Sequence, residues 1–124
     1  MGVPVLVMLR SGDWGSRHQA VSLALTAAAL GDRVVLALSG PALRAWVAGR
    51  FDEGAPPEAA GARVGSLAAM LAEGRQGLGV QVVACATEVQ LASLDPERAR
   101  EALDGLRSLP EQWGHASGGR VVAF

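Results

Sequence analysis

The chain has 124 residues, of which 50% are hydrophobic and 19% are charged, and its formal net charge is -1. This composition predicts one folded domain, residues 1–124, and excludes intrinsic disorder. All 11 basic residues are arginines. Chemistry that needs a P-loop or Schiff-base lysine is therefore excluded, and the lack of any basic run predicts no nucleic-acid partner.

The longest apolar stretch near the start, residues 3–9, is too short to cross a bilayer and lacks the flanks of a signal peptide. We therefore expect no membrane association. The chain has one cysteine, Cys85, so it forms no internal disulfide and no cysteine-rich zinc site. An unpaired thiol without a targeting segment predicts a cytoplasmic protein.

Apolar runs alternate with helical patterns from the start of the chain. Residues 3–9 are apolar on both faces, as in a strand that helices cover on both sides. In the helix predicted next, Ser16 and Gln19 have the spacing of a capping box, and Gly31 suits a left-handed stop. A second strand is predicted at residues 33–38.

The middle of the chain follows the same alternation. Pro41 suits the first turn of a helix whose apolar residues recur up to Phe51. Residues 52–63 carry prolines and glycines and predict a surface excursion. A third helix is predicted at residues 66–76 and a third strand at residues 80–84.

The last third of the chain predicts two helices and a strand. Thr87 and Gln90 have capping-box spacing, which predicts a short helical turn. Asp95 opens a longer helix that Pro110 is expected to stop, and a final strand is predicted at residues 120–124. The whole pattern predicts a three-layer α/β/α sandwich, Rossmann- or flavodoxin-like, with a mainly parallel sheet of four or five strands.

Cys85 is the strongest nucleophile candidate, and it follows the predicted strand at residues 80–84. Ligands of open parallel sheets bind beyond the carboxyl ends of the strands, so the cysteine lies at the edge where such folds act. A helix start at Thr87 and the cation Arg10 favour a thiolate there, whereas Glu88 opposes it. An unpaired cysteine in an apolar strand is also commonly a small buried hydrophobe, so both interpretations stay open.

Other polar residues are expected at the same edge because they follow the first two strands or the cysteine. The residues predicted to line a pocket there are Arg10, Ser11, Asp13, Trp14, Arg17, His18, Ser39, Thr87 and Glu88. Trp14 and Trp113 fall in segments expected to be exposed, where aromatic side chains either mark an interface or fold back over the local core. His115 is expected to be solvated in a turn.

Several kinds of catalytic or binding site are excluded or made less favourable, because the residues that they need do not stand at the required spacing. A low-molecular-weight phosphatase needs Cys-x5-Arg, but Leu91 stands at the arginine position, which also weakens a rhodanese-type loop. A papain-like pair would require His18 to reach the thiol from the first turn of a helix. The loop after the first strand lacks the pattern GxGxxG, and Asp13 would repel a phosphate there. Asp13 and Asp32 do not form the acidic pocket of a phosphorelay receiver.

The order of the predicted elements over residues 3–124 resembles that of a known protein family. The resemblance rests on the strand–loop–helix start and on three short sequences, LGDRV at 30–34, GVQVVAC at 79–85 and RVVAF at 120–124. In this set the chain resembles the DsrE/DsrF-like family, which includes TusD-type sulfur-relay proteins. The resemblance implies that Cys85 carries a persulfide, and that the subunits form trimers or hexamers with the cysteine near their boundaries.

The resemblance also implies sulfur-donor and sulfur-acceptor proteins as partners, and neither a metal nor an organic cofactor. The first hypothesis is therefore a cytoplasmic sulfur carrier, or sulfurtransferase-like protein, that acts through Cys85. The alternative is a non-catalytic oligomeric binding module of this fold, in which Cys85 is buried and inert. A third hypothesis is a flavodoxin-like protein that binds a nucleotide or phosphate.

Overall fold

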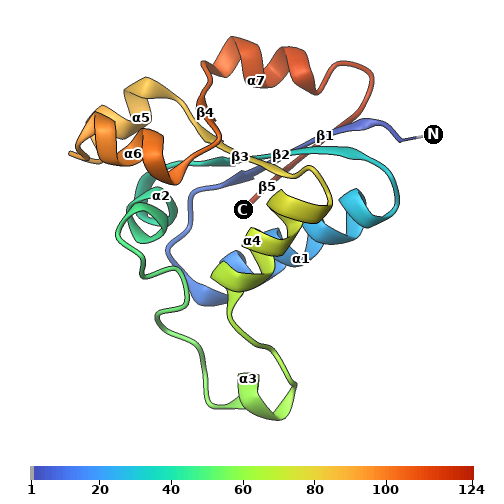
Figure 1. The fold of residues 1–124 in the computed structure, drawn as a ribbon, viewed down its shortest axis with the longest axis vertical. Coiled ribbons are helices and arrows are strands. Elements are labelled where there is room, and N and C mark those ends of the chain that lie inside the picture. The colour runs from blue at the N-terminus through green and yellow to red at the C-terminus, as the bar shows by residue number, and fades with distance from the viewer. Residues whose placement is uncertain (1) are drawn as a thin grey trace.

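A computed structural model describes residues 2–124 and shows a five-stranded parallel sheet in the order β4-β3-β2-β1-β5 (Figure 1). The strands are β1 (Pro4–Leu9), β2 (Arg33–Leu38), β3 (Gln81–Ala84), β4 (Gly105–Leu106) and β5 (Arg120–Ala123). The helices are α1 (Trp14–Ala29), α2 (Gly40–Val47), α3 (Glu58–Gly61), α4 (Leu67–Gly77), α5 (Ala86–Leu91), α6 (Pro96–Ala102) and α7 (Leu109–His115). The predicted α/β class and the alternation of strands and helices are confirmed.

The strand order explains how the helices are divided between the two faces of the sheet. From β1 to β4 the chain steps in one direction, so right-handed crossovers place the connecting helices on one side. The connection from β4 to β5 runs back across the sheet and places α7 on the opposite side (Figure 1). The structure is thus a three-layer sandwich in which α7 packs on β1 and β2 from its side.

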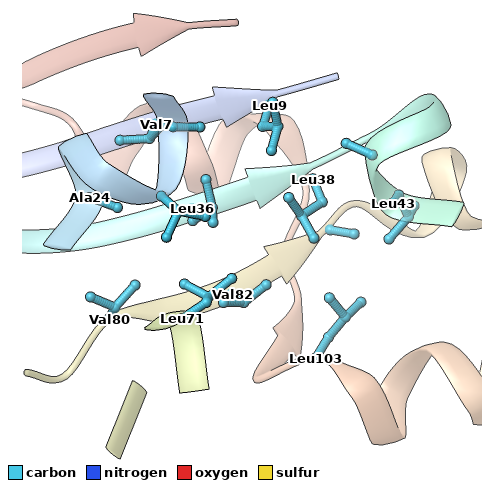
Figure 2. Packing of buried hydrophobic residues seen from close by; sticks show 14 of the residues in the cluster. Val7, Leu9, Ala24, Leu36, Leu38, Leu43, Leu71, Val80, Val82 and Leu103 are labelled. Atoms are coloured by element: carbon cyan, nitrogen blue, oxygen red, sulfur yellow. The ribbon is translucent and has the colours of Figure 1, made fainter. Parts of the chain in front are cut away.

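The main core lies between the sheet and the layer that contains α1 and α4. Val7, Leu36 and Val82 are adjacent in the strand register and are fully buried. Figure 2 shows their side chains on the same side as Ala24 of α1 and Leu71 of α4. Apolar side chains on both faces of the strands are what the continuous hydrophobic runs of the sequence require.

Both predicted capping boxes near the functional edge are wrong. Helix α1 begins at Trp14 with Asp13 as its N-cap, and the Asp13 carboxylate accepts from the Ser16 amide at 3.1 Å. Aspartate caps a helix as well as serine does, so the helix starts three residues earlier than a Ser16 N-cap predicts. Helix α5 begins directly after Cys85, which is itself the N-cap. The predicted stop at Gly31 is confirmed by its positive φ of 98°.

The prediction that Pro110 ends the helix opened by Asp95 is also wrong. Helix α6 ends at Ala102, the chain then adds β4, and Pro110 lies in the first turn of α7. Proline breaks the interior of a helix but is tolerated in its first turn, because the N–H that proline lacks would have no partner within the helix at that position. His115 ends α7, and its Nε2 lies 3.2 Å from the Val5 carbonyl oxygen, so it is not simply solvated.

The short edge strand β4 is held by a side-chain network. Asp104 accepts from Arg75 at 2.8 and 3.0 Å and from the Val82 amide at 2.7 Å. Burial raises the pKa of Asp104, but the hydrogen bonds from Arg75 and Val82 outweigh it and hold that pKa below its ordinary value. The network ties the residue before β4 to α4 and to the start of β3.

The predicted surface excursion projects away from the sheet and contains the short helix α3 (Figure 1). Its base is fixed by Asp52, whose carboxylate accepts from the Ser66 hydroxyl at 2.5 Å and from the Leu67 amide. Across residues 2–124, no helix has both the length and the apolar composition that crossing a bilayer requires.

Candidate functional site

Cys85 lies at the carboxyl end of β3, where the chain turns into α5. Its backbone is extended, with φ -82° and ψ 145°, and the residue is half-buried. Because β3 pairs with β2, which pairs with β1, the loops after all three strands emerge at this edge. The sequence therefore placed the cysteine correctly, at the edge where parallel sheets bind ligands.

A cavity of about 270 Å³ adjoins the cysteine. Its polar lining residues other than Cys85 are Arg10, Ser39, Glu88 and Gln112, and its apolar ones are Met8, Ala37, Leu38 and Leu109. These apolar residues come from β1, β2 and α7. The cavity therefore lies between the carboxyl edge of the sheet and α7, the helix that covers the face opposite α1. The thiol is half-buried and lines this cavity, so it remains accessible to a small group.

Two opposite charges stand beside the thiol. Arg10 Nη1 lies 3.4 Å from Glu88 Oε2, and the side chains are 66% and 28% exposed. The Arg10 side chain passes over Gly40, where an added Cβ would lie 3.2 Å from two of its atoms. Arg10 is therefore held over the start of α2, close to the cavity, and Glu88 offsets part of its positive charge.

The structure brings only part of the predicted set together. Arg10, Ser39 and Glu88 line the cavity of Cys85, as predicted. The predicted residues outside this cavity are Ser11, Asp13, Trp14, Arg17, His18 and Thr87. Most of these belong to α1 or to the turn before it, and α1 packs on the face opposite α7, so their side chains are carried away from the thiol.

Each displaced residue has another contact or is exposed. The Ser11 hydroxyl accepts from the Asp13 amide at 3.1 Å, and Asp13 caps α1. The rings of Trp14 and His18 stack at 5.1 Å with an interplanar angle of 3°. Thr87 is an exposed residue of α5. Since Asp13 already occupies the N-terminus of α1, that helix end is not open to a phosphate.

Sequence reasoning missed several cavity residues. Met8 of β1 and Ala37 of β2 are partners in the strand register, so their side chains lie on the same face of the sheet. The alternation of side chains along a strand identifies both residues as cavity residues once the helix that covers this face is known. Leu109 and Gln112 lie on α7, a helix that the sequence did not predict. Gln112 is buried, and its Nε2 donates to the Arg107 carbonyl at 3.0 Å, which fixes its side chain beside the cavity.

No protein-family model and no curated protein matches the chain. A solved structure does match. It is the protein of unknown function MTH1491 from Methanobacterium thermoautotrophicum, which is 15% identical, with a TM-score of 0.64 over 98% of this chain and 99% of that chain. At this identity the similarity shows the fold, an α/β sandwich of Rossmann- or flavodoxin-like arrangement.

The Arg10–Glu88 pair gives a test of how charge controls the thiol. Glu88→Gln is expected to speed alkylation of Cys85 by iodoacetamide about two- to fivefold, because it removes a negative charge and releases Arg10. Arg10→Gln is expected to slow the same reaction. Rates are measured by intact mass in the native state, with the exposed Glu97→Gln as the control that keeps the wild-type rate. Equal rates in all four proteins would show that the pair does not act on Cys85.

Proposed function

We propose that the protein is a small sulfur carrier that holds a persulfide on Cys85 and passes it between partner proteins. The observation that carries the proposal is the half-buried thiol that lines a cavity at the carboxyl edge of the sheet. The resemblance to the DsrE/DsrF-like family, in which the matching cysteine carries sulfur, supports it. Because the carrier needs a reduced thiol, we also propose that it acts in the cytoplasm.

The transfer step is an exchange between sulfur atoms. The Cys85 thiolate attacks the outer sulfur of a donor persulfide, a bond forms between the two sulfurs, and the donor leaves as a thiolate. The product is a persulfide on Cys85, and one sulfur atom has moved without net oxidation or reduction. Attack of an acceptor thiolate on the outer sulfur of that persulfide completes the cycle.

The surroundings of Cys85 suit both halves of this cycle. A cavity of about 270 Å³ admits the reacting side chain of a donor rather than a folded segment. Its apolar walls, which include Met8 and the buried Ala37, limit the access of water to the persulfide. Arg10 supplies a positive charge near the point where a leaving thiolate develops.

Loading with sulfur tests the proposal directly. After incubation with inorganic polysulfide and removal of the excess, intact mass spectrometry is expected to show one added sulfur atom on the wild-type chain. Cys85→Ser, which removes the only thiol, is expected to gain none. If Cys85 gains no sulfur while glutathione does under the same conditions, the carrier proposal is wrong and the non-catalytic binding module is favoured.

The proposed carrier is a homo-oligomer, a trimer or a hexamer. Exposed apolar side chains on α7 and β5 favour this assembly, since Leu109, Trp113 and Val121 are 57%, 69% and 43% exposed. We expect Trp113→Arg to shift the light-scattering mass towards that of a monomer, because it places a charge at the contact. A wild-type chain that is monomeric at micromolar concentration would contradict the proposed assembly.

A further inference from the structure

A second cavity, of about 390 Å³, lies at the same edge of the sheet and shares no lining residue with the cavity of Cys85. It lies between the loop after β1, which provides Gly12, and the helix α2, which provides Arg44. Arg50 and two residues at the base of the surface excursion, Glu53 and Gly54, also line it. The volume falls in the range of small-molecule sites, about 300–1,000 Å³.

Arg17 of α1 lines this cavity and is 4% exposed. Its guanidinium donates to the carbonyls of Gly12 at 3.1 Å, Glu53 at 2.5 Å and Phe51. Its Nε has no acceptor among the residues that the structure describes. The ion pairs found within residues 2–124 do not include Arg17, so its positive charge is solvated by carbonyl dipoles and by no carboxylate.

The cavity lining is strongly positive. Three arginines, Arg17, Arg44 and Arg50, line the cavity together with one acidic residue, Glu53. Within residues 2–124, these charges make one ion pair, from Arg50 Nε to Glu53 Oε2 at 3.9 Å, on side chains that are 65% and 70% exposed. Such a pair is weak and readily opened, so Arg44 and Arg50 are available to donate to a bound group.

The backbone also shapes this cavity. Gly54 has a φ of 89°, and a Cβ there would lie 3.6 Å from Arg17 Nη2. A Cβ on Gly12 would lie 2.9 Å from the Pro41 Cβ. With no side chain at either position, the loop after β1 approaches Pro41 of α2 closely, and the chain at Gly54 approaches Arg17 of α1 closely.

From the buried unpaired charge and the excess of guanidinium donors, we propose that this cavity binds the phosphate group of a small phosphorylated molecule. The planar guanidinium of Arg44 or Arg50 donates two parallel N–H groups to a tetrahedral oxyanion. Arg17 contributes a buried positive charge, which acts over a longer distance because the surrounding protein screens it less than water does. The site is separate from Cys85, so it adds a ligand to the proposed carrier.

Amide NMR titration with inorganic phosphate and with pyrophosphate, at constant ionic strength set by sodium chloride, tests this site. Saturable shifts are expected at Gly12, Ala45 and Gly54, whose residues line the cavity. Arg44→Gln combined with Arg50→Gln is expected to weaken binding about tenfold or more, which corresponds to about 1.4 kcal/mol. Cys85→Ser is expected to bind as the wild type does, so the result is independent of sulfur transfer.

The exposed Arg98→Gln of α6 is the matched control for loss of positive charge. Absence of saturable shifts with both probes would overturn the proposal. So would an equal loss of affinity in Arg98→Gln and in the double variant, because binding would then follow net charge rather than this cavity. Saturation with sodium acetate at similar affinity would also overturn it, since the site would not distinguish a phosphate from a carboxylate.

Discussion

Replacement of Arg17 by methionine is expected to lower the free energy of unfolding by about 3 kcal/mol. Methionine fills a similar volume but leaves the carbonyls of Gly12, Phe51 and Glu53 without their donor. It also removes the contact of the guanidinium with the Phe51 ring, whose centre lies 5.7 Å from Arg17 Cζ. These bonds connect α1 to the base of the excursion, so that segment is expected to become sensitive to protease as well.

Urea unfolding followed by tryptophan fluorescence measures the loss. Arg98→Met, at an exposed position of α6, is the matched control and is expected to change stability by less than about 0.5 kcal/mol. If Arg17→Met is as stable as the control, the buried guanidinium does not hold the loop, and the account of its three carbonyl contacts is incorrect.

The second large effect is expected at Gly119, just before β5. A Cβ at this position would overlap the carbonyl oxygen of Pro4, which belongs to the backbone and has little room to move. Gly119→Ala is therefore expected to destabilise the protein by about 3 kcal/mol, at the upper end for overpacking. Because β5 lies at the end of the strand order and pairs with β1, its amides are expected to lose protection against hydrogen exchange first.

Gly114→Ala is the matched control, because the same substitution at this position is expected to raise the free energy of unfolding rather than lower it. Gly114 lies in α7, and an added Cβ meets no atom within 4 Å, so alanine is expected to stabilise the helix by about 0.5–1 kcal/mol. A urea midpoint of Gly119→Ala that equals or exceeds that of the wild type would show that backbone approach at Gly119 does not control the pairing of β5.

The sequence predicted the sheet well where its strands are long and apolar. The side chains of residues 33–38 point alternately to the two faces of the sheet, and the apolar run predicts a strand without knowledge of its neighbours. The position of Cys85 followed from the same reasoning, because the end of a parallel strand fixes the edge at which the next residue lies. Gly31 was predicted correctly because a left-handed turn after a helix favours glycine.

The connection that completes the site escaped prediction for a physical reason. Strand β4 has two residues, which is too short to show any period. Pro110 is compatible with either a helix end or a helix start, and the sequence alone does not separate the two. Because α7 was not predicted, no sequence pattern indicated that Leu109 and Gln112 line the cavity.

Arg17 illustrates a different limit. Its spacing placed it near the functional edge, and it does lie there, but in the other cavity. The contacts that hold it come from Phe51 and Glu53, which are more than thirty positions away and belong to an irregular segment. Tertiary contacts with loop carbonyls leave no periodic pattern, so no rule of spacing predicts them.

The central claim, that Cys85 carries sulfur between proteins, is tested most directly by a cycle of loading and discharge on one sample. The chain is loaded with polysulfide, freed of excess reagent and mixed with an acceptor thiol, and both masses are followed. The account predicts that the chain gains one sulfur atom, returns to its original mass, and transfers that atom to the acceptor. A Cys85 that gains no sulfur, or a loaded chain whose sulfur never reaches the acceptor, would contradict it.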